Sequence, residues 1–370
     1  MLECQRLLPL LGTRALEEHE EVLRPAFAVA VTAALARSRA RAAALEALAG
    51  AVIGALERAG IESLPLKGVF LARRLYGDPG MRESSDIDLL VDRERLDEAA
   101  AVLGELGYER EAGATGVVRR PDLHHRMTNP RAGLPPVELH WRVHWYEQSF
   151  SATMLARSVP DGAGMRRPHL DDELAALLLF YARDGFLGLR LATDLGAWWD
   201  AYGHERWDTW LAGPLERHPE LRRVLLTAAA VSERAVGLPM AYLATPPKLP
   251  DRRGVLAAGL ANRSQRGAPD QLRANVALVD GLLSPDGQLP AFARRHLLLD
   301  DREIEAAYGI PEASRLRRRF WRLAHPPKLL LRFALGASSA AHRVWFRRLR
   351  MRSRTRSSMS PSVHHDPFVP

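Results

Sequence analysis

Hydrophobic residues recur with different periods along the chain, and the period changes near residue 61. Residues 2–60 are rich in leucine and alanine, and residues 26–58 contain no proline, so this segment is predicted to be helical. Helical periodicity returns at residue 168, as Leu187, Leu191, Leu195 and Trp198 illustrate, and continues to about residue 310. The two ends of the chain are therefore expected to be mainly helical.

Between these helical regions, short apolar runs alternate with glycine-ended helical segments. Helices are predicted over 68–76 and 93–106. Strands are predicted over 61–66, 86–91, 108–111, 116–119 and 137–143. Strands and helices mixed over so short a region are typical of a small α/β or α+β domain. The expected fold is a mixed sheet flanked by N-terminal and C-terminal helical segments.

This pattern divides the chain into four expected parts. They are an N-terminal helical segment (1–60), an α/β core (61–150), a helical domain (151–313) and a tail (314–370). The tail is expected to be basic and amphipathic, and its end, from residue 358, is expected to be disordered.

Composition narrows the class of protein. Apolar residues make up 47% of the 370 residues and charged residues 26%, which excludes global disorder and collagen-like repeats. Cys4 is the single cysteine, so an internal disulfide is excluded. No apolar run approaches the roughly 20 residues that a membrane span needs. We therefore expect a cytoplasmic protein.

The net charge of +8 is concentrated near the C-terminus. Residues 314–356 contain 14 lysines and arginines and neither aspartate nor glutamate, so the preceding part is mildly acidic. Within 326–356, leucines and aromatic residues are interleaved with arginines. Three interpretations remain open: this segment lies on an anionic membrane surface, binds nucleic acid, or packs on the acidic part of the chain.

Three carboxylates are placed where they could share one site. Residues i and i+2 of a strand face the same side, so Asp86 and Asp88 project together while Ile87 points away. Glu138 lies between Val137 and Leu139 in another predicted strand. An isolated Asp-x-Asp pair is also found at solvated strand ends. Three clustered carboxylates, however, repel one another unless a cation such as Mg²⁺ lies between them.

Three motifs carry a resemblance to a known family. They are Leu-Lys-Gly at 66–68, Asp-Ile-Asp-Leu-Leu-Val at 86–91 and Val-Glu-Leu-His-Trp at 137–141. In residues 5–200 the chain resembles the nucleotidyltransferase superfamily with the DNA polymerase β-type fold, particularly its largely uncharacterised bacterial branch. The resemblance implies transfer of a nucleotidyl group by two Mg²⁺ (or Mn²⁺) ions. Asp86 and Asp88 would hold both ions, and Glu138 would be the third catalytic carboxylate.

The turn before the first helix of this core departs from the superfamily pattern. Most members have a serine there that contacts the phosphates of the nucleotide, whereas this chain has Lys67 and Gly68. Gly68 still permits close approach of a phosphate, and Lys67 could contact it as a point charge. Arg82 and Ser85 complete the candidate nucleotide-binding residues. The alternative for Arg82 is an ion pair with Asp78 or Glu83.

Four further residues are candidates for an acceptor pocket: His124, His125, His140 and Asp194. The histidines could equally make structural hydrogen bonds. A zinc site built from His140 and His144 is disfavoured, because residues four apart share a face on a helix and not on a strand. Asp194 lies on the apolar stripe of its helix. The alternative for it is a buried ion pair with Arg183 or Arg190.

The expected activity is transfer of a nucleoside monophosphate from an NTP to a hydroxyl or phosphate acceptor, with release of pyrophosphate. The acceptor, whether small molecule, peptide, lipid-linked sugar, protein or RNA, is left open by the sequence. A second hypothesis is a non-catalytic scaffold that keeps the fold and has lost phosphate binding. A third is a peripheral membrane or nucleic-acid-binding module that acts through the tail.

Overall fold

The computed structural model describes residues 6–111, 123–162, 165–186, 189–203, 207–236, 249, 251–264, 279–288, 290, 293, 297–308, 310, 314–328 and 331. The predicted strand 116–119, Leu187 and the end of the tail lie outside these residues. Among the described residues, none of the helices combines the length and apolar character needed to cross a bilayer.

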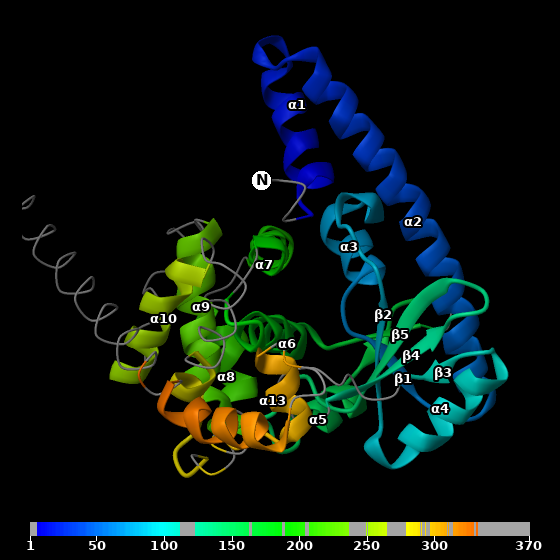
Figure 1. The fold of residues 1–370 in the computed structure, drawn as a ribbon. Helices are drawn as coiled ribbons and strands as arrows, with labels where there is room; N and C mark the ends of the chain where they lie inside the picture. Colours follow the sequence, from blue (N-terminus) through cyan, green and yellow to red (C-terminus); the bar gives the residue numbers. More distant parts are fainter. Residues whose placement is uncertain are drawn as a thin grey trace, which may run out of the picture.

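Five strands form a mixed sheet in the order β1-β2-β5-β4-β3, which confirms the predicted α/β fold class (Figure 1). β2 and β5 are parallel, and the other three pairings are antiparallel. The strands are β1 (Ser63–Pro65), β2 (Ile87–Val91), β3 (Glu109–Arg110), β4 (His124–Asn129) and β5 (Leu134–His140).

Two strands of this sheet differ from the sequence prediction. β4 was not predicted, because its residues His-His-Arg-Met-Thr-Asn lack an apolar alternation. β5 was predicted over 137–143, but it begins at Leu134, includes two prolines and ends at His140. It ends there because the amides of Trp141 and Arg142 both donate to the carbonyl of Leu123, which takes the chain out of the ladder.

One face of the sheet is covered by helices from the N-terminal half. The long helix α2 and the helix α4 pack on Ile87, Leu89 and Val91 of β2 and on Val137 and Leu139 of β5. The elements of this half are η1 (a π-helix, Leu8–Gly12), α1 (Thr13–His19), η2 (Glu20–Val22), α2 (Pro25–Arg58), α3 (Val69–Tyr76), η3 (Pro79–Met81), η4 (Arg93–Arg95) and α4 (Leu96–Glu105).

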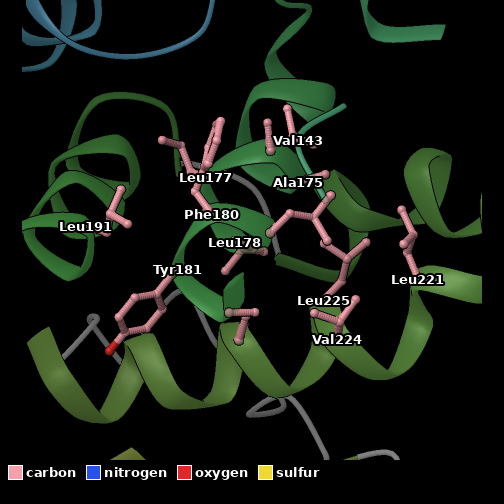
Figure 2. Packing of buried hydrophobic residues seen from close by; sticks show 14 of the residues in the cluster. Val143, Ala175, Leu177, Leu178, Phe180, Tyr181, Leu191, Leu221, Val224 and Leu225 are labelled. Atoms are coloured by element: carbon pink, nitrogen blue, oxygen red, sulfur yellow. The ribbon is translucent and has the colours of Figure 1, made fainter. Parts of the chain in front are cut away.

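The other face of the sheet meets the helices that follow. Residues 172–182 of α6 are all buried, and Leu178 and Tyr181 lie on the side of α6 that faces α9 (Figure 2). Leu64 and Leu90 of the sheet belong to the same core. The elements are α5 (Phe150–Ala156), β6 (Val159–Pro160), β7 (Arg166–Arg167), α6 (Leu170–Arg183), α7 (Leu189–Tyr202), α8 (Trp207–Arg217), η5 (Pro219–Leu221), α9 (Arg222–Val236), α10 (Arg252–Ser264) and α13 (Asp301–Tyr308).

Candidate active site

The sheet register brings the predicted carboxylates together. Asp88 of β2 lies directly opposite Glu138 of β5, and Leu90 lies opposite His140. Directly paired residues share a face, so Asp88, Glu138 and His140 all face the side of the sheet that α6 covers. Asp86 lies one residue before β2, at the entrance to the same face. The alternating residues of β2 point into the opposite core, and this alternation fixes which side the carboxylates occupy.

Lys67, which follows β1, reaches this polar face at Asp88. Its Nζ donates to Oδ1 of Asp88 at 2.6 Å and lies 5.0 Å from the centre of the Phe180 ring on α6. Gly68 follows with φ 81° and precedes the first residue of α3. Because this conformation is strained for residues with a side chain, a glycine is required to turn from Lys67 into the helix.

Histidines surround the carboxylates on the neighbouring strands. Nε2 of His140 is 3.0 Å from Oδ1 of Asp88 and 3.4 Å from Oε2 of Glu138. Nε2 of His124, on β4 opposite His140, is 3.7 Å from the same Glu138 oxygen. The candidate metal-ligating atoms of His124, Glu138 and His140 all lie within 4.8 Å of one another.

The other two histidines considered from the sequence, His125 and His144, lie elsewhere. His125 is on the opposite face of β4, where its ring meets the edge of Trp141 at 5.1 Å between centroids. His144 follows the end of β5 and lies among Trp145 and Tyr146. His140 and His144 therefore do not form the zinc site considered from the sequence. The histidine that lies beside His140 and Glu138 is His124 instead.

Burial and neighbouring charges separate the pKa values of the carboxylates. Burial, reinforced by the nearby charge of Asp88, raises the pKa of Asp86. Burial also acts to raise the pKa of Asp88. Lys67 and His140 outweigh this effect and hold the pKa of Asp88 well below its usual range. His140 similarly lowers the pKa of Glu138 against the effect of burial. Burial, together with His140, lowers the pKa of His124 to about 4.

Arg82 and Asp194 form an ion pair with each other. Nε of Arg82 lies 2.9 Å from Oδ2 of Asp194, and both side chains are almost fully buried. Tyr76 also donates to Asp194, and Arg82 donates to the hydroxyl of Ser84.

The ion-pair partners that the sequence suggested for Arg82 and for Asp194 were therefore wrong. Asp78 pairs with Arg39 instead. Arg190 donates to the carbonyl of Glu83, and Arg183 stacks on Phe180 and donates to the carbonyl of Val143.

Sequence reasoning missed several residues near the Gly68 turn. The Ser84 hydroxyl lies 3.8 Å from the point where a Cβ of Gly68 would be, so a hydroxyl is present beside the turn although the turn itself lacks one. Nη1 of Arg6 donates to Oγ of Ser85 at 3.2 Å. Arg190 of α7 is close enough to Asp86 to influence its charge. Arg190 was considered from the sequence only as an ion-pair partner of Asp194, four residues along the helix, whereas nothing local pointed to Arg6.

Comparison with known families agrees with this geometry. A model of the family described as "Uncharacterised nucleotidyltransferase" matches residues 1–236, more than half of the chain. The chain belongs to this uncharacterised nucleotidyltransferase family. Neither the curated proteins nor the solved structures contain a match. Membership of the nucleotidyltransferase family supports nucleotidyl transfer as the general activity and implies an NTP as a substrate.

The donor atoms fit the divalent ions that nucleotidyltransferases generally use. Asp88 and Glu138 are neighbours in register, and the pKa of Asp86 responds to both of them. These carboxylates offer the hard oxygen ligands that Mg²⁺ and Mn²⁺ prefer. Lys67 and His140 both approach Oδ1 of Asp88, so positive charge and hydrogen-bond donors already compensate part of the clustered negative charge.

Proposed function

We propose that this protein transfers a nucleoside monophosphate from an NTP to a hydroxyl or phosphate acceptor, with Mg²⁺ or Mn²⁺ as cofactor. The observation that supports this most directly is the in-register pairing of Asp88 with Glu138, with Asp86 beside them, in a member of the nucleotidyltransferase family. In the reaction an acceptor oxygen bonds to the α-phosphorus as the bond from that phosphorus to pyrophosphate breaks.

Each side chain has a role in this proposal. Asp86 and Asp88 would hold the metal ions, and Glu138 would hold the ion nearer the acceptor. Divalent ions at these positions would neutralise phosphate charge and lower the pKa of a bound hydroxyl. Glu138 takes up the proton when the acceptor is a hydroxyl. Lys67 keeps Asp88 ionised and lies beside the Gly68 turn, where a phosphate can approach the backbone. Ser85, whose hydroxyl accepts a hydrogen bond from Arg6, directly precedes Asp86.

The acceptor side is proposed to lie along β4 and β5. His124 is partly exposed next to Glu138, so it can contact an acceptor, whereas His140 is fully buried and acts on the carboxylates. His125 faces the other side of the sheet, and the carboxylate of Asp194 is ion-paired with Arg82. Arg82 and Asp194 are therefore proposed to position the loop that carries Ser84 and Ser85, and His125 to support β4.

The competing hypothesis is a scaffold that binds no nucleotide. Thermal melting separates the two, since a ligand at 100 times its Kd stabilises the folded state by about 2.7 kcal/mol. Mg–NTP should raise the melting temperature of the wild type but not of Asp86→Asn or Asp88→Asn. Glu138→Gln should retain part of the shift and lose turnover, measured as label transferred from α-labelled NTP. The exposed Asp97→Asn is the matched control. The absence of a shift in the wild type would support the scaffold, and equal shifts in all variants would show that these carboxylates do not hold the metal.

A further inference from the structure

We propose that His124, Glu138 and His140 form a site for a divalent transition metal of the Zn²⁺ class, on the acceptor side of the carboxylates. This inference deepens the proposed function, and the metal's role in nucleotidyl transfer rests on that function. The binding of the metal does not depend on it, because binding needs neither nucleotide nor acceptor.

The distances suit a tetrahedral ion. Ligand atoms about 2.1 Å from a tetrahedral zinc ion lie about 3.4 Å from one another. Oε2 of Glu138 lies 3.4 Å from Nε2 of His140 and 3.7 Å from Nε2 of His124. Oδ1 of Asp88, 3.0 Å from Nε2 of His140, is placed to become a fourth ligand or to leave that position to an acceptor oxygen. The ligand atoms of His124 and His140 lie within 4.8 Å of each other, and Nε2 of His140 gives up its hydrogen bond with Asp88 when it binds the ion.

The ligand types favour a transition metal over Mg²⁺. Imidazole nitrogens suit zinc and its neighbours, whereas Mg²⁺ prefers oxygen ligands and retains water. His124 keeps 34% of its side-chain surface exposed and Glu138 keeps 17%, so the ion has a route from solvent. His140 is fully buried and fixes the inner end of the site.

Titration of the full chain with Co²⁺, followed by visible absorption, tests the site without nucleotide. We expect one Co²⁺ per chain with a tetrahedral spectrum, displaced by Zn²⁺ and not by Mg²⁺ at similar concentration. His124→Gln should weaken Co²⁺ binding at least tenfold. His125→Gln is the matched control, because His125 is on the same strand and faces the other way. Circular dichroism melting checks that each variant folds.

Failure of this inference is distinct from failure of the proposed function. Absence of Co²⁺ binding by the wild type, or equal binding by His124→Gln, would show that the cluster is only a set of hydrogen-bonded ion pairs. Nucleotidyl transfer with Mg²⁺ could still be observed in that case. Conversely, tight Zn²⁺ binding without any Mg–NTP shift would support the metal site and overturn the proposed transferase.

A second, independent observation concerns the helical residues 315–328, drawn in orange near α13 (Figure 1). Their inner face packs on α13: the rings of Trp321 and Tyr308 stack at 4.1 Å, and Nη1 of Arg318 lies 2.8 Å from Oε1 of Glu305. Arg322 pairs with Asp301 on the same side. This face of the helix is therefore occupied.

The outer face of the same helix is apolar and exposed. Leu316, Phe320 and Leu323 are spaced by four and three residues, which places them on one face, and they are 79%, 61% and 78% exposed. Leu331 is exposed as well. Arg315, Arg317 and Arg319 are exposed along the same stretch. An apolar stripe bordered by arginines is typical of helices that lie in the surface of a membrane.

We infer that this face docks on an anionic lipid bilayer. Charge complementarity supports this occupant, because residues 314–356 contain 14 basic residues and no acidic one. A nucleic acid would explain the arginines but would leave the row of leucines and phenylalanine in water.

Co-sedimentation of the full chain with vesicles tests this inference. We expect binding to phosphatidylcholine vesicles that contain phosphatidylglycerol, weaker binding at high salt, and little binding to phosphatidylcholine alone. The double variant Leu316→Gln/Leu323→Gln should lower partitioning at least tenfold. Val22→Gln/Val29→Gln, at two exposed apolar positions elsewhere, is the control. Unchanged binding by the leucine variant, or binding to RNA with none to vesicles, would overturn the proposed docking face.

Discussion

The Nζ atom of Lys67 lies 2.6 Å from Oδ1 of Asp88, and this contact changes the electrostatics expected of the carboxylate cluster. Considered alone, Asp86, Asp88 and Glu138 repel one another, and replacing any of them by an amide should relieve strain. Lys67 and His140 instead compensate Asp88, while none of the described residues makes a comparable contact with Asp86, whose pKa is raised. The two aspartates should therefore respond differently to substitution.

We predict that Asp88→Asn destabilises the metal-free protein, by about 2 kcal/mol, because Lys67 loses its buried counter-charge. Asp86→Asn should leave the stability equal or higher, since burial and Asp88 already disfavour its charged form. Urea unfolding in the presence of a chelator measures both effects. Equal destabilisation by the two amides would contradict the assignment of Lys67 to Asp88.

A second prediction concerns Lys67 itself. Lys67→Ala should weaken Mg–NTP binding at least tenfold and slow transfer, because it removes both the partner of Asp88 and the point charge beside the Gly68 turn. Lys67→Arg should restore only part of the affinity, since a planar guanidinium replaces a compact ammonium. Isothermal titration with a non-hydrolysable NTP measures this. An unchanged affinity in Lys67→Ala would remove the lysine from the nucleotide site.

The sequence was most informative where local pattern decides structure. The alternation of Ile87, Leu89 and Val91 predicted β2 and placed Asp88 on its polar face, as the structure shows. Two prolines obscured the start of β5, because proline is disfavoured within strands. The mainly polar β4 has one apolar residue, Met127, and no apolar alternation, although it supplies His124.

Contacts between distant segments could not be predicted. The pairing of Arg82 with Asp194 joins residues 112 positions apart, and Arg6 meets Ser85 across 79 positions. Arginines are so frequent in this chain that every acidic residue has several plausible partners in the sequence. Arg82 directly follows η3, and the packing of η3 on α3 and of α3 on α7 brings it to Asp194, so this pair depends on the whole fold.

The Arg82–Asp194 pair yields a third prediction. Breaking a buried ion pair from one side leaves an uncompensated charge, so Asp194→Asn or Arg82→Met should each cost about 3 kcal/mol of stability. The double variant Arg82→Met/Asp194→Asn should cost clearly less than the sum. Urea unfolding of the four proteins gives the coupling energy. Strict additivity would mean that the two side chains are not energetically coupled.

The fourth prediction concerns where the chain can be shortened. The packing of Trp321 on Tyr308 and the ion pairs of Arg318 and Arg322 join residues 315–328 to α13, which itself covers Leu299 and Ile310. Deletion from residue 314 onward should therefore cost about 2 kcal/mol through lost aromatic burial, relative to deletion from residue 332 onward, which keeps these contacts. Calorimetry of both truncated proteins and the full chain measures this. Equal melting temperatures for the two deletions would show that the helix adds nothing to stability, and its arginines would then serve partners outside the fold.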